Sequence, residues 1–183
     1  MKKLTAIILA IFCLLNLTAC FPVDPGYGNT VAYAGWSDDP SITEGALNKD
    51  TLTDNHLPIF KIDTLEDLES FKEKYASILS MDSGYNKTLS FNAALAKAQW
   101  DREAFFQNNT LLVVYVPANS GSLRFAVHNI EVTYESVCVY VEQTNHPEVV
   151  TDDMAGWFVL VEIADDEISN CYAYDAIFVN SEK

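Results

Sequence analysis

The most informative apolar pattern in the sequence is the unbroken run Leu111–Val116 and the alternating stretch that follows it. The run is rich in β-branched residues, and the next segment, Pro117–Gly121, is a cluster of turn formers. In Leu123–Val127, apolar residues alternate with other types. The pattern predicts two strands joined by a turn into a hairpin. A strand that is apolar on both faces belongs inside a covered sheet, so we expect this hairpin at the centre of the core.

The second strand of the hairpin is expected to run on through Ile130–Val132. Five further segments have the short apolar runs or the alternation typical of strands. They are Asn29–Gly35, Leu57–Ile62, Val137–Val141, Trp157–Ile163 and Ala176–Val179. In Val137–Val141 the three valines share one face, and Cys138 and Tyr140 share the other. The segment Val149–Trp157 is expected to cross between strands.

Helical spacing occurs before the predicted hairpin. Leu65, Leu68, Phe71 and Tyr75 form an apolar stripe, and Asp63 or Thr64 precedes it as a candidate N-cap. The alanine-rich stretch Ser90–Gln99 favours a second helix, and Trp100–Phe106 predicts one further turn. We therefore predict an α+β fold in which a curved antiparallel sheet of about six strands packs against one or two α-helices.

The N-terminus has the pattern of an export signal. Lys2 and Lys3 precede the apolar stretch Leu4–Leu15, which is too short to span a bilayer comfortably. Leu17-Thr18-Ala19-Cys20 follows and resembles a bacterial lipobox, which implies cleavage before Cys20 and lipidation of its thiol. An ordinary secretory signal cleaved nearby and an uncleaved anchor are the alternatives. The expected organisation is a signal peptide over 1–19, a lipidated cysteine and linker over 20–28, and a single domain over 29–183.

The charge balance limits the kind of partner. Removing residues 1–19 lowers Lys plus Arg from 11 to 9 against 26 acidic residues, which is a net charge of −17. Such a protein is repelled by nucleic acid and by anionic lipid. The acidic pairs and triplets lack the spacing of a calcium loop, and no Cys-His cluster has zinc spacing, so we expect no metal and no cofactor.

Two cysteines remain once Cys13 leaves with the signal peptide and Cys20 is lipidated. Outside the cytoplasm, Cys138 and Cys171 can form a disulfide. Two free thiols buried in strands are the other interpretation, and the sequence leaves both open.

The candidate binding surface consists of two loops, Pro117–Arg124 and His146–Trp157. Arg124, one of two arginines in a very acidic chain, directly follows the predicted turn. The side chains proposed for this surface are Ser120, Ser122, Arg124, His146, Asp152, Asp153 and Trp157. Neither serine lies in a nucleophile elbow, and hydroxyls that close a turn explain both residues.

The order of these elements resembles the C-terminal domain family of PrcB, the protease-complex subunit, and related secreted bacterial domains. The corresponding segments are Leu65–Phe71, Asp101–Phe106, Leu111–Val116, Ser120–Ser122, Ile130–Val141, Pro147–Thr151 and Trp157–Ile163, within a core of about 59–163. The turn Asn119–Ser122 has fewer glycines than the family pattern. The resemblance implies a non-catalytic accessory or binding domain.

Three classes of function follow from these observations. The first is a protein-interaction module held at the extracytoplasmic face of the cell membrane, associated with a secreted protease or another envelope protein. The second is a lipoprotein that binds a small ligand or glycan on Trp36, Trp100, Trp157 or tyrosines. The third is a hydrolase, which requires a pocket that brings His146 or His128 against a serine or an aspartate.

Overall fold

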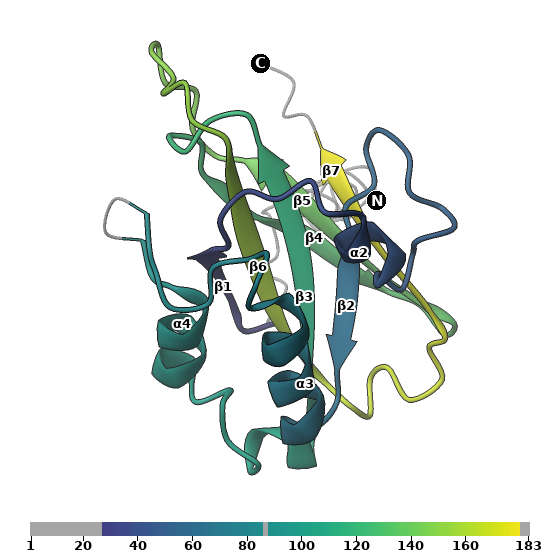
Figure 1. Cartoon of the computed structure of the whole chain (residues 1–183). Helices are drawn as coiled ribbons and strands as arrows, with labels where there is room; N and C mark the ends of the chain where they lie inside the picture. Colours follow the sequence, from purple (N-terminus) through teal and green to yellow (C-terminus); the bar gives the residue numbers. More distant parts are fainter. Residues whose placement is uncertain (1–26, 86–87, 180–183) are drawn as a thin grey trace, which may run out of the picture.

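The computed structural model describes residues 27–85 and 88–179, which form one α+β domain (Figure 1). The predicted signal peptide, the lipidation site Cys20 and the linker up to residue 26 lie outside this range. Within the described residues, seven strands are divided between two sheets. The α+β class and the single domain are thereby confirmed.

The first sheet is antiparallel throughout. Its four strands, in spatial order, are β1 (Asn29–Tyr33), β6 (Ala155–Ala164), β3 (Asn109–Ala118) and β2 (Ile59–Ile62). The two central strands pair along all ten residues, from Asn109 opposite Ala164 to Ala118 opposite Ala155. Both are almost continuously buried, as expected of strands that are covered on both faces.

The second sheet has three strands. They are, in spatial order, β4 (Phe125–Val132), β5 (Ser136–Gln143) and β7 (Ala173–Val179). The first pair is antiparallel, with a register shift between Val127 and Asn129, whereas β5 and β7 are parallel. Val137, Val139 and Val141 are fully buried, which confirms the alternation predicted for this strand.

Short helices cover the outer face of the first sheet (Figure 1). They are α2 (Pro40–Glu44), α3 (Leu65–Tyr75), α4 (Phe91–Ala98) and the 3-10 turn η1 (Phe105–Gln107). Thr64, rather than Asp63, caps α3 by accepting a hydrogen bond from the Asp67 amide at 3.0 Å. Ser90 caps α4 in the same way, and Gln99 ends that helix in the left-handed conformation.

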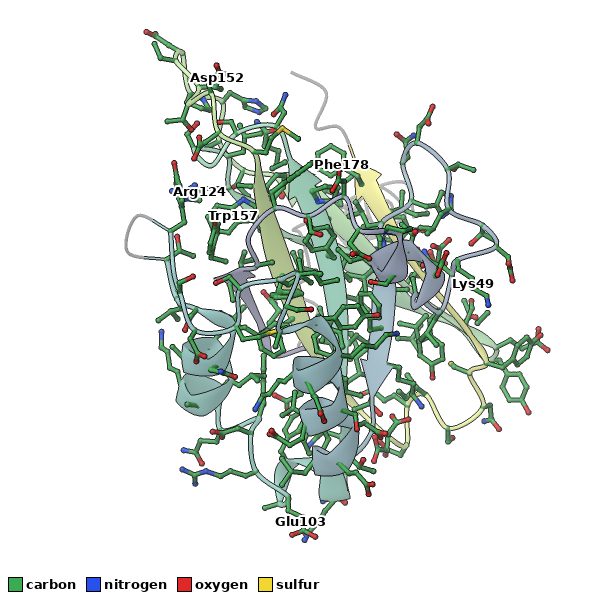
Figure 2. All side chains as sticks on the ribbon, in the orientation of Figure 1. Lys49, Glu103, Arg124, Asp152, Trp157 and Phe178 are labelled. Carbon is green, nitrogen blue, oxygen red and sulfur yellow. The ribbon has the colours of Figure 1, made fainter. Side chains whose placement is uncertain are left out.

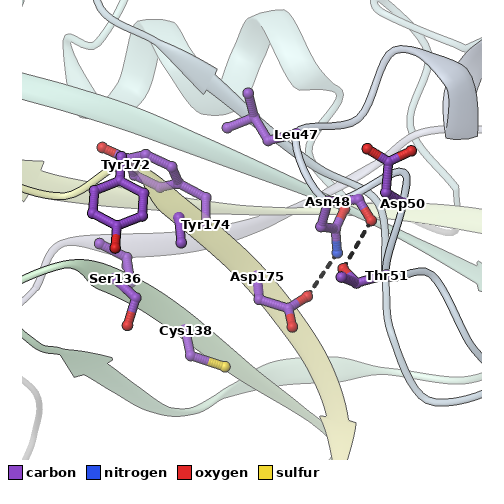
Figure 3. Close-up of a pocket in the computed structure, with 11 residues that line it drawn as sticks. Leu47, Asn48, Asp50, Thr51, Ser136, Cys138, Tyr172, Tyr174 and Asp175 are labelled. Atoms are coloured by element: carbon purple, nitrogen blue, oxygen red, sulfur yellow. Dashed lines mark hydrogen bonds between the residues drawn. The ribbon is translucent and has the colours of Figure 1, made fainter.

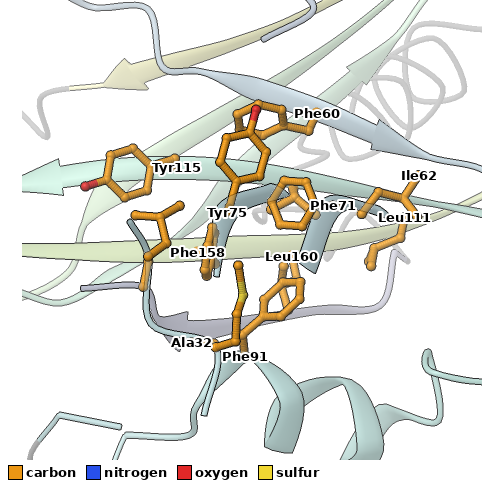
Figure 4. Packing of buried hydrophobic residues seen from close by; sticks show 14 of the residues in the cluster. Ala32, Phe60, Ile62, Phe71, Tyr75, Phe91, Leu111, Tyr115, Phe158 and Leu160 are labelled. Carbon is orange, nitrogen blue, oxygen red and sulfur yellow. The ribbon is translucent and has the colours of Figure 1, made fainter. Parts of the chain in front are cut away.

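Two hydrophobic cores result from this layering. One lies between the helices and the first sheet, and Figure 4 shows its aromatic rings, including Phe71, Phe91 and Phe158. The Phe91 and Phe158 ring centroids are 4.8 Å apart, within the usual range for packed aromatic pairs. The other core lies between the two sheets and includes Leu112, Val114 and Val159. Alternate residues of β3 therefore belong to different cores.

The predicted hairpin between Leu111–Val116 and Leu123–Val127 is wrong, although both segments are strands. β3 pairs with β2 and β6, whereas β4 belongs to the second sheet and pairs with β5. The physical reason is that an all-apolar strand needs neighbours and cover on every side. An alternating strand suits a sheet with one exposed face. The segment between them therefore passes from one sheet to the other.

The burial of β3 leads to a stability prediction. Leu112→Ala should lower the free energy of unfolding by about 2–5 kcal/mol, because it leaves a cavity between two sheets that close around it. Leu47→Ala is the matched control and should change stability by less than about 0.5 kcal/mol, since Leu47 is 51% exposed. Chemical denaturation of both variants measures the difference. Equal destabilisation would contradict the assigned core.

Candidate functional site

The two loops expected to form a joint surface lie together at one end of the domain. The Gly121 amide donates to the Asp153 carbonyl at 3.0 Å, and Asn145 Nδ2 donates to the Ser122 carbonyl at 2.8 Å. Asn145 Oδ1 also accepts from the Arg124 amide at 2.7 Å. Residues 119–124 and 144–154 are thus fastened to each other at several points, and we call them the paired loops.

Ser120 is structural rather than reactive. It is completely buried, and its Oγ lies 2.8 Å from both Ser122 Oγ and Thr151 Oγ1. The Ser122 amide donates to the same oxygen at 3.2 Å. These hydroxyl contacts close the turn, as the sequence indicated, and also attach it to the second loop.

Trp157 lies beneath the paired loops, and Arg124 connects it to the first of them. Trp157 is completely buried, and its ring packs edge-on against Tyr33 and Tyr85. The Arg124 guanidinium lies 4.9 Å from the centre of the Trp157 ring and donates to the Gly121 and Leu123 carbonyls. The expectation that Trp157 belongs to an exposed binding surface is therefore wrong. Side chains of β6 alternate between the two faces of the sheet, and Trp157 is on the face that packs into the core between the sheets.

Gly121 is required where the two loops meet. A Cβ at this position would lie 2.7 Å from Asp153 Oδ2 and would overlap the Tyr85 ring. The requirement is one of space, because its backbone is not in the left-handed region. Hydrogen bonds from the Thr151 and Tyr85 hydroxyls and from the Gly121 amide hold the pKa of Asp153 below its usual value.

The remaining predicted polar residues are at the surface. Asp152 is exposed at the end of the second loop (Figure 2). His146 is exposed, and its Nδ1 lies 3.4 Å from Gln143 Nε2. His128 lies against Glu142 at 3.2 Å. Neither histidine meets a serine or an aspartate within hydrogen-bond distance among the described residues, so the arrangement that the hydrolase hypothesis required is not formed here.

The paired loops expose three large apolar side chains to solvent. Val149, Val150 and Met154 are 83%, 55% and 52% exposed. They fall within six residues of one another, whereas exposed apolar residues scattered singly would need no explanation. We call these three side chains the apolar tip. The fold gains little from them, because each faces solvent.

The tryptophans offer less as ligand platforms than the sequence suggested. Trp100 is buried, with its Nε1 donating to Glu162 Oε2 at 2.9 Å, so it cannot stack on a ligand. Trp157 is excluded by its burial, and Trp36 remains 40% exposed.

The two cysteines of the domain are free thiols. Cys138 stands opposite Asp175 in the β5–β7 register, whereas Cys171 Sγ donates to the Thr133 carbonyl, before β5 begins. A disulfide needs their Cα atoms within about 7 Å of each other, which this register does not provide. Burial raises the pKa of the Cys138 thiol, and this disfavours the reactive thiolate.

The structure brings together one polar network that sequence reasoning missed. His56 Nδ1 lies 2.9 Å from Asp175 Oδ1, and Asn48 Nδ2 donates to the same oxygen at 2.7 Å. The network attaches the segment before β2 to the edge of β7, where the Leu57 amide also donates to the Ala176 carbonyl. His56 and Asp175 are 119 residues apart, so no local pattern signals their meeting. No group of three or more metal-ligating side chains forms in the described part of the chain.

Two tryptophans that differ in burial allow a test of whether the Trp157 ring supports the paired loops. Trp157→Ala should lower the free energy of unfolding by about 3–5 kcal/mol and loosen the paired loops, because the ring fills the space beneath them. Trp36→Ala should stay within about 0.5 kcal/mol. Thermal unfolding with proteolysis of the loops provides both readouts. A stable Trp157→Ala variant would show that the ring is not a support.

No protein-family model, curated protein or solved structure matches this chain.

Proposed function

We propose that this protein is a lipid-anchored, non-catalytic interaction module at the extracytoplasmic face of a bacterial cell membrane. It binds a cell-envelope or secreted protein through the paired loops. A secreted protease is the partner class that the resemblance to PrcB-type domains implies. The observation that carries the proposal is the apolar tip, which exposes three large side chains on loops that the domain holds in place.

Support for the anchor comes from the N-terminal sequence. The basic start, the apolar stretch and the Leu17–Cys20 motif follow one another in the order of a lipoprotein signal. Two or three acyl chains at Cys20 would hold the protein stably on a membrane. No helix among the described residues is long and apolar enough to span a bilayer.

The paired loops and the point where the linker enters lie at opposite ends of the first sheet. Asn29, at the start of β1, pairs with Val161 near the end of β6, whereas the second loop leads into the beginning of β6 at Ala155. Val161 lies six residues along β6 from Ala155, which is about 20 Å at the rise of a strand. Figure 1 shows this separation along β6. A chain anchored through Cys20 would therefore present the apolar tip away from the anchored end.

The linker end is itself fastened to the domain. The Glu162 amide donates to the Gly28 carbonyl at 2.7 Å, and Tyr27 Oη donates to Glu167 Oε2 at 2.6 Å. The second hydrogen bond raises the pKa of Tyr27 to about 12, because the phenol must give up its contact with Glu167 when it loses its proton. Six residues separate Cys20 from Tyr27. Fully extended, they would reach about 25 Å, which would keep the entry end close to the bilayer.

The setting of the apolar tip favours a protein over a membrane as its partner. Glu148, Asp152 and Asp153 are neighbours in sequence of the three apolar residues. Their charge, and the negative charge of the whole domain, oppose insertion between anionic lipids. A loop held by hydrogen bonds at several points also loses less conformational freedom when a partner binds. Both features suit a preformed protein-binding surface.

Removal of the lipidation site is the first test. Cys20→Ser should abolish incorporation of fatty acid, because the acyl chains can no longer be attached, and should leave the apolar segment Leu4–Leu15 uncleaved. Metabolic labelling with a fatty acid and the size of the protein on a gel measure this. Cys13→Ser is the matched control and should leave both readouts unchanged. Continued fatty-acid labelling of Cys20→Ser would contradict the proposed anchor.

The apolar tip is tested by site-specific photo-crosslinking in intact cells. A photoreactive residue in place of Met154 should give a discrete cross-linked product, whereas the same residue at exposed Glu103, far from the loops in Figure 2, should give none. Adding Val150→Asp should reduce the Met154 product about tenfold, because a charge replaces a buried apolar contact in the complex. The thermal midpoint should not move. Equal products from both positions would contradict a specific surface.

A further inference from the structure

A groove lies away from the paired loops, where β5 and β7 begin. It is an open groove of about 530 Å³ between the loop 47–51 and the first residues of both strands (Figure 3). The wall that belongs to the loop includes Leu47, Asn48 and Asp50, and the strand side includes Ser136, Cys138 and Asp175. Tyr172 and Tyr174 also line it. None of these residues belongs to the proposed protein-binding end.

The charged side chains that line this groove are both acidic. Asp50 and Asp175 contribute carboxylates, and no basic residue is among the side chains that line it. Of the lysines nearby in sequence or space, Lys49 lies outside the lining, and Lys61 is paired with Asp63 at 2.9 Å. The acidic domain around the groove adds to a negative potential that attracts cations.

The upper walls are apolar and face solvent. Leu47 is 51% exposed and Tyr172 is 74% exposed. The Tyr172 hydroxyl donates to Glu135 Oε2 at 2.9 Å, which fixes the ring and places a third carboxylate at the rim. The face of the ring is thus available next to a negative charge. A cation–π contact already exists at the second tyrosine of the groove, where Lys61 Nζ lies 5.5 Å from the centre of the Tyr174 ring.

The floor is held in place before any ligand binds. The Asp175 carboxylate accepts from Asn48 Nδ2 and from the Ala176 amide, and it meets His56 Nδ1, which is not among the residues that line the groove. These contacts fix the carboxylate and the loop wall relative to β7. A ligand therefore meets an Asp175 carboxylate that needs no reordering.

We propose that this groove binds a cationic side chain, most simply an arginine, from a peptide segment of a partner protein. The guanidinium would lie between Tyr172 and the Asp175 carboxylate, with Asp50 adding negative charge from the loop wall (Figure 3). Its aliphatic stem would pack on Leu47. Arginine suits this site because it combines a planar, weakly hydrated charge with an apolar stem. A groove that offers carboxylates and an exposed aromatic ring, with no lysine or arginine among its lining side chains, is complementary to that side chain.

The test uses the purified full chain in a non-ionic detergent and two capped pentapeptides of glycine around one central residue. The central residue is arginine in one peptide and citrulline, which has the same shape without the charge, in the other. The arginine peptide should bind at least tenfold more tightly by calorimetry or by chemical-shift titration. Its affinity should fall as salt is raised.

Variants of the groove connect binding to the named residues. Asp50→Asn and Tyr172→Ala should each weaken the arginine peptide about threefold, and the double variant about tenfold, which matches an exposed ion pair and one cation–π contact. Asp101→Asn, the same change at an exposed acid elsewhere, should have no effect. Val150→Asp should also leave binding unchanged, so this test is separate from that of the apolar tip.

Two outcomes would overturn the proposal. Equal binding of the arginine and citrulline peptides, or no binding of either, would show that charge does not select the ligand. Preferential binding of a neutral N-acetylglucosamine oligomer that is lost with Tyr172→Ala would assign the groove to a glycan instead.

Discussion

The rest of the structure depends on the burial of one antiparallel pair, β3 with β6. Both strands are apolar on both faces, so the pair is stable only if a layer covers each side. The short helices supply one layer, and the three-stranded sheet supplies the other. Residues such as Val113 and Val114 are adjacent in sequence but belong to different cores. The order of layers thus follows from the side-chain alternation of this pair.

This layering also creates the paired loops. The chain leaves β3 in one sheet and must enter β4 in the other, and the connection into β6 ends at the same place. Trp157 fills the space beneath, Arg124 bridges from it to the turn, and Gly121 permits the loops to touch. Their polar groups are largely satisfied within the pair, which leaves the apolar tip as the part that offers binding energy to a partner.

The groove at the start of β5 and β7 has a different origin. β7 is an edge strand of the second sheet, and the segment before β2 lies along its outer edge. Hydrogen bonds from His56 and Asn48 to Asp175 hold that segment in place. The two candidate surfaces therefore differ in chemistry, because the apolar tip would bury hydrophobic area and the groove would hold a charge. A partner that used both would gain from their separate, fixed positions.

Much of the fold was predictable from local pattern. The buried run Leu111–Val116 and the helix that begins after Asp63 or Thr64 are readable from residue order, because alternation and capping report each residue's immediate surroundings. The contact between the two loops was only a hypothesis at that level. Pairing is not local. Whether Phe125 joins β3 or β5, and whether Trp157 faces solvent or the space between sheets, depends on how whole layers cover each other. His56 and Asp175 meet only through that packing, so the tertiary structure alone decided the groove beside them.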